Sequence, residues 1–195
     1  SLVGSEMCIR DSVWIAVGEK LHALDPATGA VVQSIDVAAQ AGTAFDGQHL
    51  YQIAGDVIQK IDPASGRILG TIPAPHGEGN SGMAWAEGML WVGRYKDRTI
   101  LQVDPATGAI LRTIASDRYV TGVTWVDGGL WHGTWEDDAS ELRHVDPQSG
   151  EVLESLALPA GVVVSGLESD GGDVFYCGGA TSGRLRAVRK PRALA

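Results

Sequence analysis

The sequence predicts an all-β fold, a single five-bladed β-propeller domain with four-stranded antiparallel blades, because two short patterns repeat along the chain. The hexapeptide DPATGA occurs at 25–30 and again at 104–109, and its relatives DPASGR and DPQSGE occupy 62–67 and 146–151. A small residue followed by Gly recurs at 41–42, 81–82, 121–122 and 165–166. Both patterns return about every 40 residues, which is the length of a propeller blade.

The segments between these patterns read as strands. LHALDP at 21–26, LQVDP at 101–105 and ILRTIAS at 110–116 alternate apolar with polar residues. Turn-bounded runs of this kind, rich in Val, Ile, Leu and Trp, are typical of strands, and no segment shows the 3.6-residue apolar stripe of a helix. We therefore expect each unit to form a meander of four antiparallel strands.

The predicted blades span approximately residues 5–40, 41–80, 81–120, 121–163 and 164–195. In blade 1, residues 13–37 are expected to hold the second to fourth strands. SEMCIRDS at 5–12 aligns with SGMAWAEG at 81–88, which places Met7 and Ile9 in the first strand. Blade 5 has three predicted strands, and because propellers close by joining their termini, Leu2 and Val3 are expected to add its short outer strand.

The repeated hexapeptide is interpreted as a turn and not as a binding site. In DP-x-[TS]-G, Pro presets φ at the second turn position, Asp accepts hydrogen bonds from the following backbone amides, and Gly adopts the left-handed conformation. We expect it to join the third and fourth strands of each blade.

Composition excludes two classes of partner. The formal charge of −9 and the pI near 4.9 argue against nucleic acid, whose binding depends on Lys and Arg. No run reaches the roughly 18 to 20 apolar residues that span a membrane.

The start, SLVGSEMCIRDS, resembles a translated sequencing-adapter fragment. We therefore expect the natural N-terminus to be missing, which leaves periplasmic, secreted and cytoplasmic locations open, as well as the oligomeric state.

The repeat unit resembles those of the YncE-like, virginiamycin B lyase-like and glutaminyl cyclase-like propellers. The shared features are small-Gly-aliphatic, LW and DP-x-[TS]-G, and LWHGTWEDDASELRHVDPQSGEV at 130–152 looks like one blade of the cyclases. The cyclase resemblance implies chemistry at one mouth of the channel, around an acidic residue and several tryptophans, although the TQGL and EGWGL segments are absent. The lyase resemblance implies catalytic histidines and a divalent metal, of which PHGEG at 75–79 is a faint sign without a clear metal motif.

A binding site is expected at one rim of the channel, over blades 3 to 5. The loop between the second and third strands lies at the same end as the connection to the next blade. This loop is minimal in blades 1 and 2 (Gly18-Glu19 and Gly55-Asp56) but longer in blades 3 and 4, and longer loops on a rigid frame concentrate binding residues. The candidates are His76, Glu78, Asn80, Arg94, Tyr95, Asp117, Arg118, Tyr119, His132, Trp135, Glu136, Asp137 and Cys177.

Trp135 breaks the repeat, because Trp14, Trp91 and Trp131 share one column and Trp85 and Trp125 share another. Trp135 and Tyr95 are expected to form an aromatic wall of the site, or else Trp135 covers a blade edge.

His132 is a candidate general base, with Glu136 or Asp137 as its acidic partner. Alternatively, His132 is hydrogen-bonded between blades and the acids form a solvated loop or a loose cation site.

Arginine next to tyrosine, at Arg94-Tyr95 and Arg118-Tyr119, is expected to clamp a carboxylate, or else to make surface salt links. Cys177 occupies a column of small or apolar residues, which favours a buried structural thiol over a nucleophile or metal ligand.

Together these features predict a propeller that binds a small polar ligand, one bearing a carboxylate. The enzymatic version of this hypothesis is acyl-transfer cyclisation or elimination. The alternative is a non-catalytic propeller that docks a protein or peptide.

Overall fold

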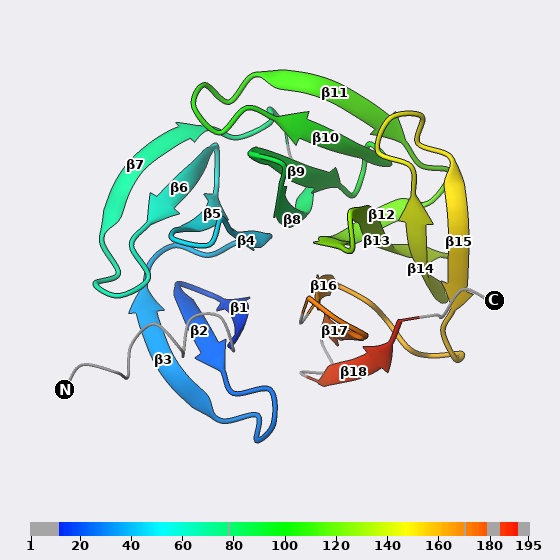
Figure 1. The fold of residues 1–195 in the computed structure, drawn as a ribbon, viewed down its shortest axis with the longest axis horizontal. Helices are drawn as coiled ribbons and strands as arrows, with labels where there is room; N and C mark the ends of the chain where they lie inside the picture. The colour runs from blue at the N-terminus through cyan, green and yellow to red at the C-terminus, as the bar shows by residue number, and fades with distance from the viewer. Residues whose placement is uncertain (1–11, 78, 170, 179–183, 191–195) are drawn as a thin grey trace.

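The computed structural model describes residues 12–77, 79–169, 171–178 and 184–190. These residues form strands β1 to β18 and no helix, and the strands make five antiparallel sheets (Figure 1). The sheets stand around a central channel as the blades of a propeller, and chain order follows the ring from blade 1 to blade 5. The predicted five-bladed β-propeller is therefore confirmed.

Blades 1 and 2 hold β1 (Val13–Val17), β2 (Lys20–Leu24) and β3 (Val31–Asp36), then β4 (Thr43–Phe45), β5 (Leu50–Ala54), β6 (Val57–Ile61) and β7 (Ile68–Pro73). Blade 3 holds β8 (Asn80–Ala86), β9 (Met89–Arg94), β10 (Thr99–Val103) and β11 (Ile110–Ala115). Blade 4 holds β12 (Tyr119–Val126), β13 (Gly129–Glu136), β14 (Ala139–Val145) and β15 (Val152–Ala157), and blade 5 holds β16 (Gly166–Ser169), β17 (Val174–Gly178) and β18 (Leu185–Arg189).

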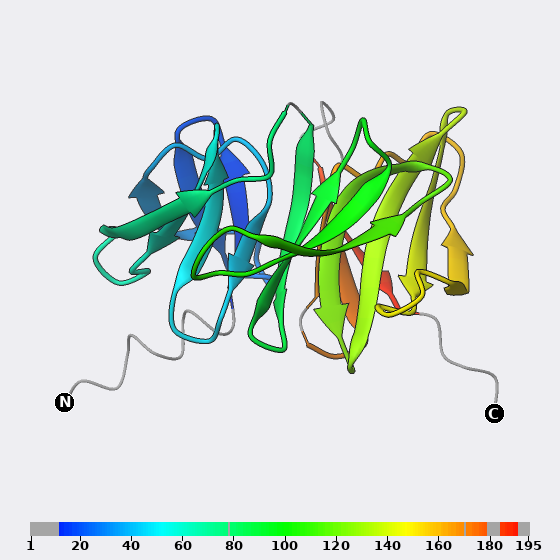
Figure 2. The same cartoon turned by 90° about the horizontal axis from the view of Figure 1, so that it is seen from above.

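The described strands of blade 1 are the three expected within residues 13–37. The strand expected around Met7 and Ile9, and the outer strand expected at Leu2 and Val3, lie outside the described residues. Seen from the side, the blades form a disc with hairpin turns at its two ends (Figure 2). The described part of the chain contains no helix long and apolar enough to cross a membrane.

The repeated hexapeptide forms a hydrogen-bonded turn, as expected of a frame element. In blade 1, the Asp25 carboxylate accepts hydrogen bonds from the Ala27 amide at 2.8 Å and from the Thr28 hydroxyl at 2.9 Å. Gly29 has a φ of 71°, which favours glycine. The same aspartate contacts recur in the other three copies of the hexapeptide, so these acids and hydroxyls are occupied within the turn.

The small-Gly pattern lets the inner strands approach one another. A Cβ atom on Gly42 would lie 2.3 Å from the Met83 amide, and one on Gly82 would lie 2.2 Å from the Val123 amide. Such distances are shorter than any tolerated contact, so only glycine fits where the backbones of neighbouring blades meet.

Aromatic stacking joins successive blades. The Tyr51 and Trp85 rings stack with centroids 5.2 Å apart, and those of Trp91 and Trp125 with centroids 5.8 Å apart. Stacked rings bury large apolar areas and add about 0.5–1.5 kcal/mol beyond that burial. The tryptophan columns thus belong to the core between blades.

Blade 4 corrects one expectation about the rim. In blade 3 the extra residues form a loop, Tyr95–Arg98, between paired Arg94 and Thr99. In blade 4 they lengthen the strands instead, because β13 and β14 stay paired as far as Glu136 and Ala139. Only Asp137 and Asp138 remain in the turn, both at positive φ (48° and 59°), as a type I′ turn requires.

Candidate functional site

A pocket of about 260 Å³ lies at the rim over blades 3 to 5, where the site was expected. We call it the mouth pocket. Its described lining consists of two aromatic rings, three hydroxyl side chains and two valines: Ser81, Tyr95, Thr121, Trp135, Val163, Val164 and Ser165. An apolar cavity with a few polar groups is the usual form of a small-molecule site.

Tyr95 and Trp135 line the mouth pocket together, from blades 3 and 4. Tyr119 supports this aromatic wall from outside the lining. Its ring stacks on Tyr95 with centroids 4.7 Å apart, and it pairs with Trp135 across β12 and β13. Two neighbouring blades therefore hold the wall in place.

Arg98 connects this wall to Glu136 of blade 4, and it was not among the sequence candidates. Its guanidinium lies 4.3 Å from the Tyr119 ring centroid, and its Nη2 is 3.1 Å from Glu136 Oε1. The Asp117 carbonyl also accepts a hydrogen bond from Arg98. The signal was present in the sequence, since Arg98 belongs to the longer loop of blade 3.

His132 lies elsewhere. Its side chain is 2% exposed and lines a separate cavity of about 200 Å³, together with Asp117 and Arg143. Burial lowers the pKa of His132 to about 4, so the imidazole is neutral at pH 7. Its Nδ1 is 3.4 Å from the Gly133 carbonyl oxygen. Because His132 does not line the mouth pocket, the geometry does not support its use there as a general base.

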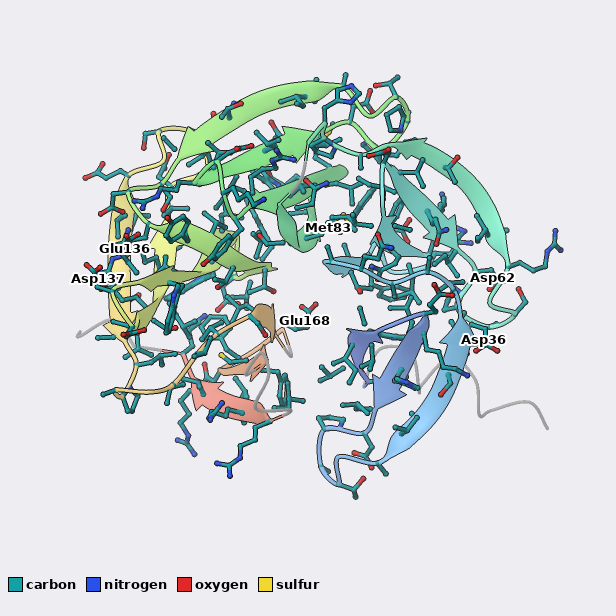
Figure 3. All side chains as sticks on the ribbon, turned by 180° about the vertical axis from the view of Figure 1, so that it is seen from behind. Asp36, Asp62, Met83, Glu136, Asp137 and Glu168 are labelled. Carbon is teal, nitrogen blue, oxygen red and sulfur yellow. The ribbon has the colours of Figure 1, made fainter. Side chains whose placement is uncertain are left out.

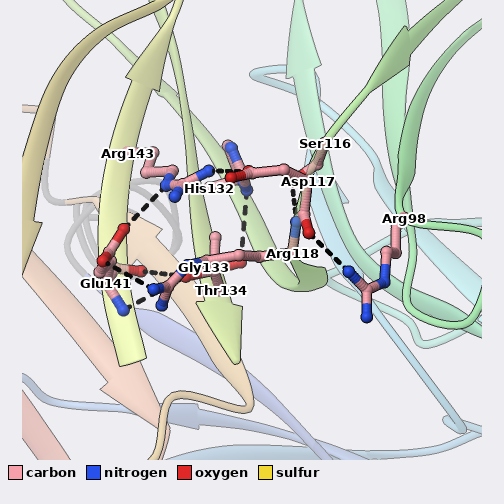
Figure 4. Close-up of polar contacts among 9 residues, drawn as sticks. All are labelled: Arg98, Ser116, Asp117, Arg118, His132, Gly133, Thr134, Glu141 and Arg143. Carbon is pink, nitrogen blue, oxygen red and sulfur yellow. Dashed lines mark hydrogen bonds and ion pairs between the residues drawn. The ribbon is translucent and has the colours of Figure 1, made fainter. Parts of the chain in front are cut away.

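Arg118 and Arg143 bind acids of the protein itself (Figure 4). Glu141 accepts from Arg143 Nε at 2.9 Å and lies 3.3 Å from Arg118 Nη2. Arg143 also bonds the Asp117 carboxylate, which lowers the pKa of Asp117. Neither arginine lines the mouth pocket, so a carboxylate clamp by Arg118 has no support in this arrangement.

Arg94 holds the connection into blade 3. It is 5% exposed and donates to Asp97 at 2.9 Å, to Asn80 at 3.0 Å, and to the Pro75 and Gly77 carbonyl oxygens. With its donors directed to this connection, Arg94 makes a salt link within the protein, and because its side chain is buried this link is not the surface link given as the alternative.

The remaining candidates are dispersed. His76 is exposed on the connection that Arg94 holds, and Glu78 lies outside the described residues. Asp137 is exposed in its turn. Cys177 is buried beside Leu167, and burial raises its pKa to about 11, so the thiol stays protonated at neutral pH.

Glu168 was also missed, and it lies in the channel. The sequence places it in a column with Ala44, Ala84 and Thr124, two residues after the repeated Gly. A carboxylate in a column of small residues breaks the repeat. Because this column lies on the inner strands, the break indicates a polar group in the channel. Burial raises the pKa of Glu168 to about 7. Within the described residues, no group of three or more His, Cys, Asp or Glu side chains could hold a metal ion.

Comparisons with solved structures agree with the fold. A glutaminyl cyclase of Myxococcus xanthus superposes with a TM-score of 0.73 at 17% identity, covering 90% of this chain and 84% of that one. The Cps50 (Swd1) β-propeller domain of Myceliophteria thermophila gives 0.60 at 14% identity, covering 94% and 64%. The WD40 β-propeller domain of Doa1 gives 0.58 at 15% identity, covering 91% and 60%.

The chain spans less than two thirds of the last two structures but most of the cyclase. No protein-family model matches it, and no curated protein sequence matches it. The chain is therefore a five-bladed β-propeller similar in structure to a glutaminyl cyclase, and at these identities the similarity shows the fold alone.

Proposed function

We propose that this propeller binds a small organic molecule in the mouth pocket. The observation that carries the proposal is that Tyr95 and Trp135, from different blades, line one pocket together with hydroxyl side chains. Tyr119 stacking and the β12–β13 pairing fix the two rings before any ligand arrives. A preformed aromatic wall lowers the entropy lost on binding.

The lining indicates the chemistry of the ligand. Two rings and two valines suit an apolar or flat body, whereas Ser81, Thr121 and Ser165 suit a hydroxyl or amide edge. Each nearby arginine has an acidic partner within the protein: Arg94 with Asp97, Arg98 with Glu136, and Arg118 with Glu141. A neutral polar ligand therefore fits the pocket better than the carboxylate that the sequence suggested.

The test is a fragment titration of the full chain, with neutral aromatic amides and alcohols as probes. Trp135→Ala should weaken binding by roughly tenfold or more, because it removes one wall. Leu153→Ala is the matched control, since Leu153 is 54% exposed on the outer strand of the same blade. If no fragment binds and a peptide or protein does, the mouth is a docking surface and the small-molecule proposal fails.

A second candidate is cyclisation of an N-terminal glutaminyl residue, which is favoured by the similarity to the Myxococcus cyclase over most of both chains. In that reaction the α-amine bonds to the side-chain carboxamide carbon and ammonia leaves. The described lining of the mouth pocket carries no carboxylate or imidazole to move the proton. Glu136, whose Oε2 is buried without a hydrogen bond among the described residues, is the acid next to the wall.

Ammonia release from a glutaminyl peptide tests this second function. Loss of turnover in Glu136→Gln but not in Asp137→Asn would support it, since Asp137 is exposed in a turn. Absence of ammonia release by the wild-type chain would restrict the mouth pocket to binding.

A further inference from the structure

Two cavities follow the central channel and share part of their lining. They measure about 290 and 200 Å³, and Trp14, Thr43 and Glu168 line both. We call the smaller one the lower channel cavity. It reaches Phe45 and Leu50, which flank the turn between the first two strands of blade 2. That end of the disc is opposite the rim that carries the mouth pocket.

Aromatic side chains from four blades surround the lower channel cavity. They are Trp14, Phe45, Trp85 and Trp125. Trp85 is held by its stack on Tyr51, and Trp125 by its stack on Trp91. The rings are therefore positioned by the core of the propeller and not by a flexible loop.

Glu168 brings a formal charge into this setting. Among the described residues that line either cavity, no other side chain is charged, and Tyr176 is the only other titratable group. Glu168 Oε1 accepts from the Thr124 hydroxyl at 3.1 Å and from the Ser169 amide at 2.9 Å. No hydrogen bond to Oε2 occurs within the described part of the chain, and Figure 3 shows Glu168 reaching toward the middle of the ring.

A single carboxylate among aromatic rings attracts a cation. Burying an unpaired carboxylate is costly, and a bound cation removes that cost. Ring faces attract cations as well, most strongly when both are removed from water. The raised pKa of Glu168 agrees with a carboxyl group that is removed from water and has no cationic partner among the described residues.

We propose that the lower channel cavity binds a small alkylated ammonium ion, with its positive charge against Glu168 and its alkyl groups against the tryptophans. A primary ammonium carries three N–H donors that need acceptors. An alkylated ammonium has few or none, so one carboxylate and aromatic walls satisfy it. This site is independent of the mouth pocket.

Calorimetric titration of the full chain at pH 8 tests the proposal. The probes are choline, its neutral isostere 3,3-dimethylbutan-1-ol, and ethanolamine. Choline should bind at least about tenfold more tightly than either of the others, since only choline combines a positive charge with alkyl groups that suit the ring faces of a desolvated site. Equal binding of the neutral isostere, or no binding of choline at millimolar concentration, would overturn the proposal.

Matched variants locate the site. Glu168→Gln keeps the shape of the side chain and should abolish the preference for choline over its isostere. Glu87→Gln removes one carboxylate from an exposed turn at the same end of the disc, and should change nothing. Should Glu168→Gln not fold, Trp14→Leu serves as a second variant, with a loss of choline affinity expected. Choline binding must survive Trp135→Ala, so failure of this site and failure of the mouth pocket give different results.

Discussion

The rings of Tyr95 and Tyr119 stack with centroids 4.7 Å apart and an interplanar angle of 16°, and this contact joins blade 3 to blade 4 behind the mouth pocket. Tyr119→Ala should destabilise the fold by about 1–3 kcal/mol, because it removes the stack and the ring beneath Arg98. The same variant should weaken fragment binding, since Tyr95 loses its support. Urea unfolding and fragment titration measure the two effects. Tyr119→Phe keeps the ring and should restore both, whereas unchanged binding in the alanine variant would show that the stack does not position the wall.

The pH dependence of stability should report the burial of His132. Its folded pKa of about 4 lies below the ordinary histidine value of 6.5, so the unfolded chain binds more protons between these values. Stability from the neutral imidazole is therefore complete above pH 6.5 and is lost as the pH falls toward 4, by up to roughly 3 kcal/mol.

His132→Gln should remove this loss, because Gln52 occupies the same column in blade 2 and is fully buried there. Urea unfolding at pH 4.5 and 7.5 measures the difference between variant and wild type. His76→Gln changes an exposed histidine, so this variant should show the same pH dependence of stability as the wild type. An equal pH dependence in wild type and His132→Gln would contradict the assigned burial.

Glu168 should have the opposite effect on stability. Its folded pKa of about 7 lies above the ordinary glutamate value of 4.5, so the folded chain holds the proton more strongly. Stability should fall as the pH rises from about 4.5 to 7. Glu168→Gln should gain stability relative to wild type at pH 8 but not at pH 4, as measured by thermal or urea unfolding. A constant difference across this range would show that the carboxyl is not desolvated.

Alanine in place of a turn glycine should test how closely the turn packs against the preceding blade. Gly66 has a φ of 72°, and a Cβ there would lie 2.9 Å from Ile35 of the preceding blade. Gly29 has a similar φ of 71°, with nothing within 4 Å of its Cβ position. Gly29→Ala should cost about 1–2 kcal/mol for the left-handed backbone alone. Gly66→Ala should cost more in urea unfolding, because Ile35 must also move. Equal costs would exclude this packing between blades.

The fold could be predicted from the sequence because the same turn motif, and the same glycine at which the inner strands approach one another, recur along the chain. The number of residues between two strands, however, does not show whether those residues form a loop or extend the paired strands. In blade 4 the residues around Thr134 and Ser140 continued the strand ladder instead of forming a loop, because both side chains are buried and their backbones pair across β13 and β14.

The site was only partly predictable for a related reason. Trp135 was found because it breaks the repeat, and Tyr95 because it was expected to form an aromatic wall with Trp135, and they do line one pocket. His132 and Arg94 were candidates for their polar chemistry, but a buried polar residue can be satisfied inside the protein, as the contacts of Arg94 show. The column of a residue in the repeat predicts its position along a strand of the blade, but not which side chains of the next blade it contacts. Glu168 also breaks its column of small residues, but it lies in the channel and not on the longer rim loops that the loop lengths indicated.

The most direct test of the mouth pocket is the ¹H–¹⁵N spectrum of the tryptophan indoles during titration with neutral aromatic amides and alcohols. The proposed function predicts that binding fragments shift the Trp135 indole signal saturably, leave the Trp14 signal in place, and lose affinity in Trp135→Ala. Fragments that bind while the Trp135 signal stays unchanged, or that bind equally well to Trp135→Ala, would contradict it.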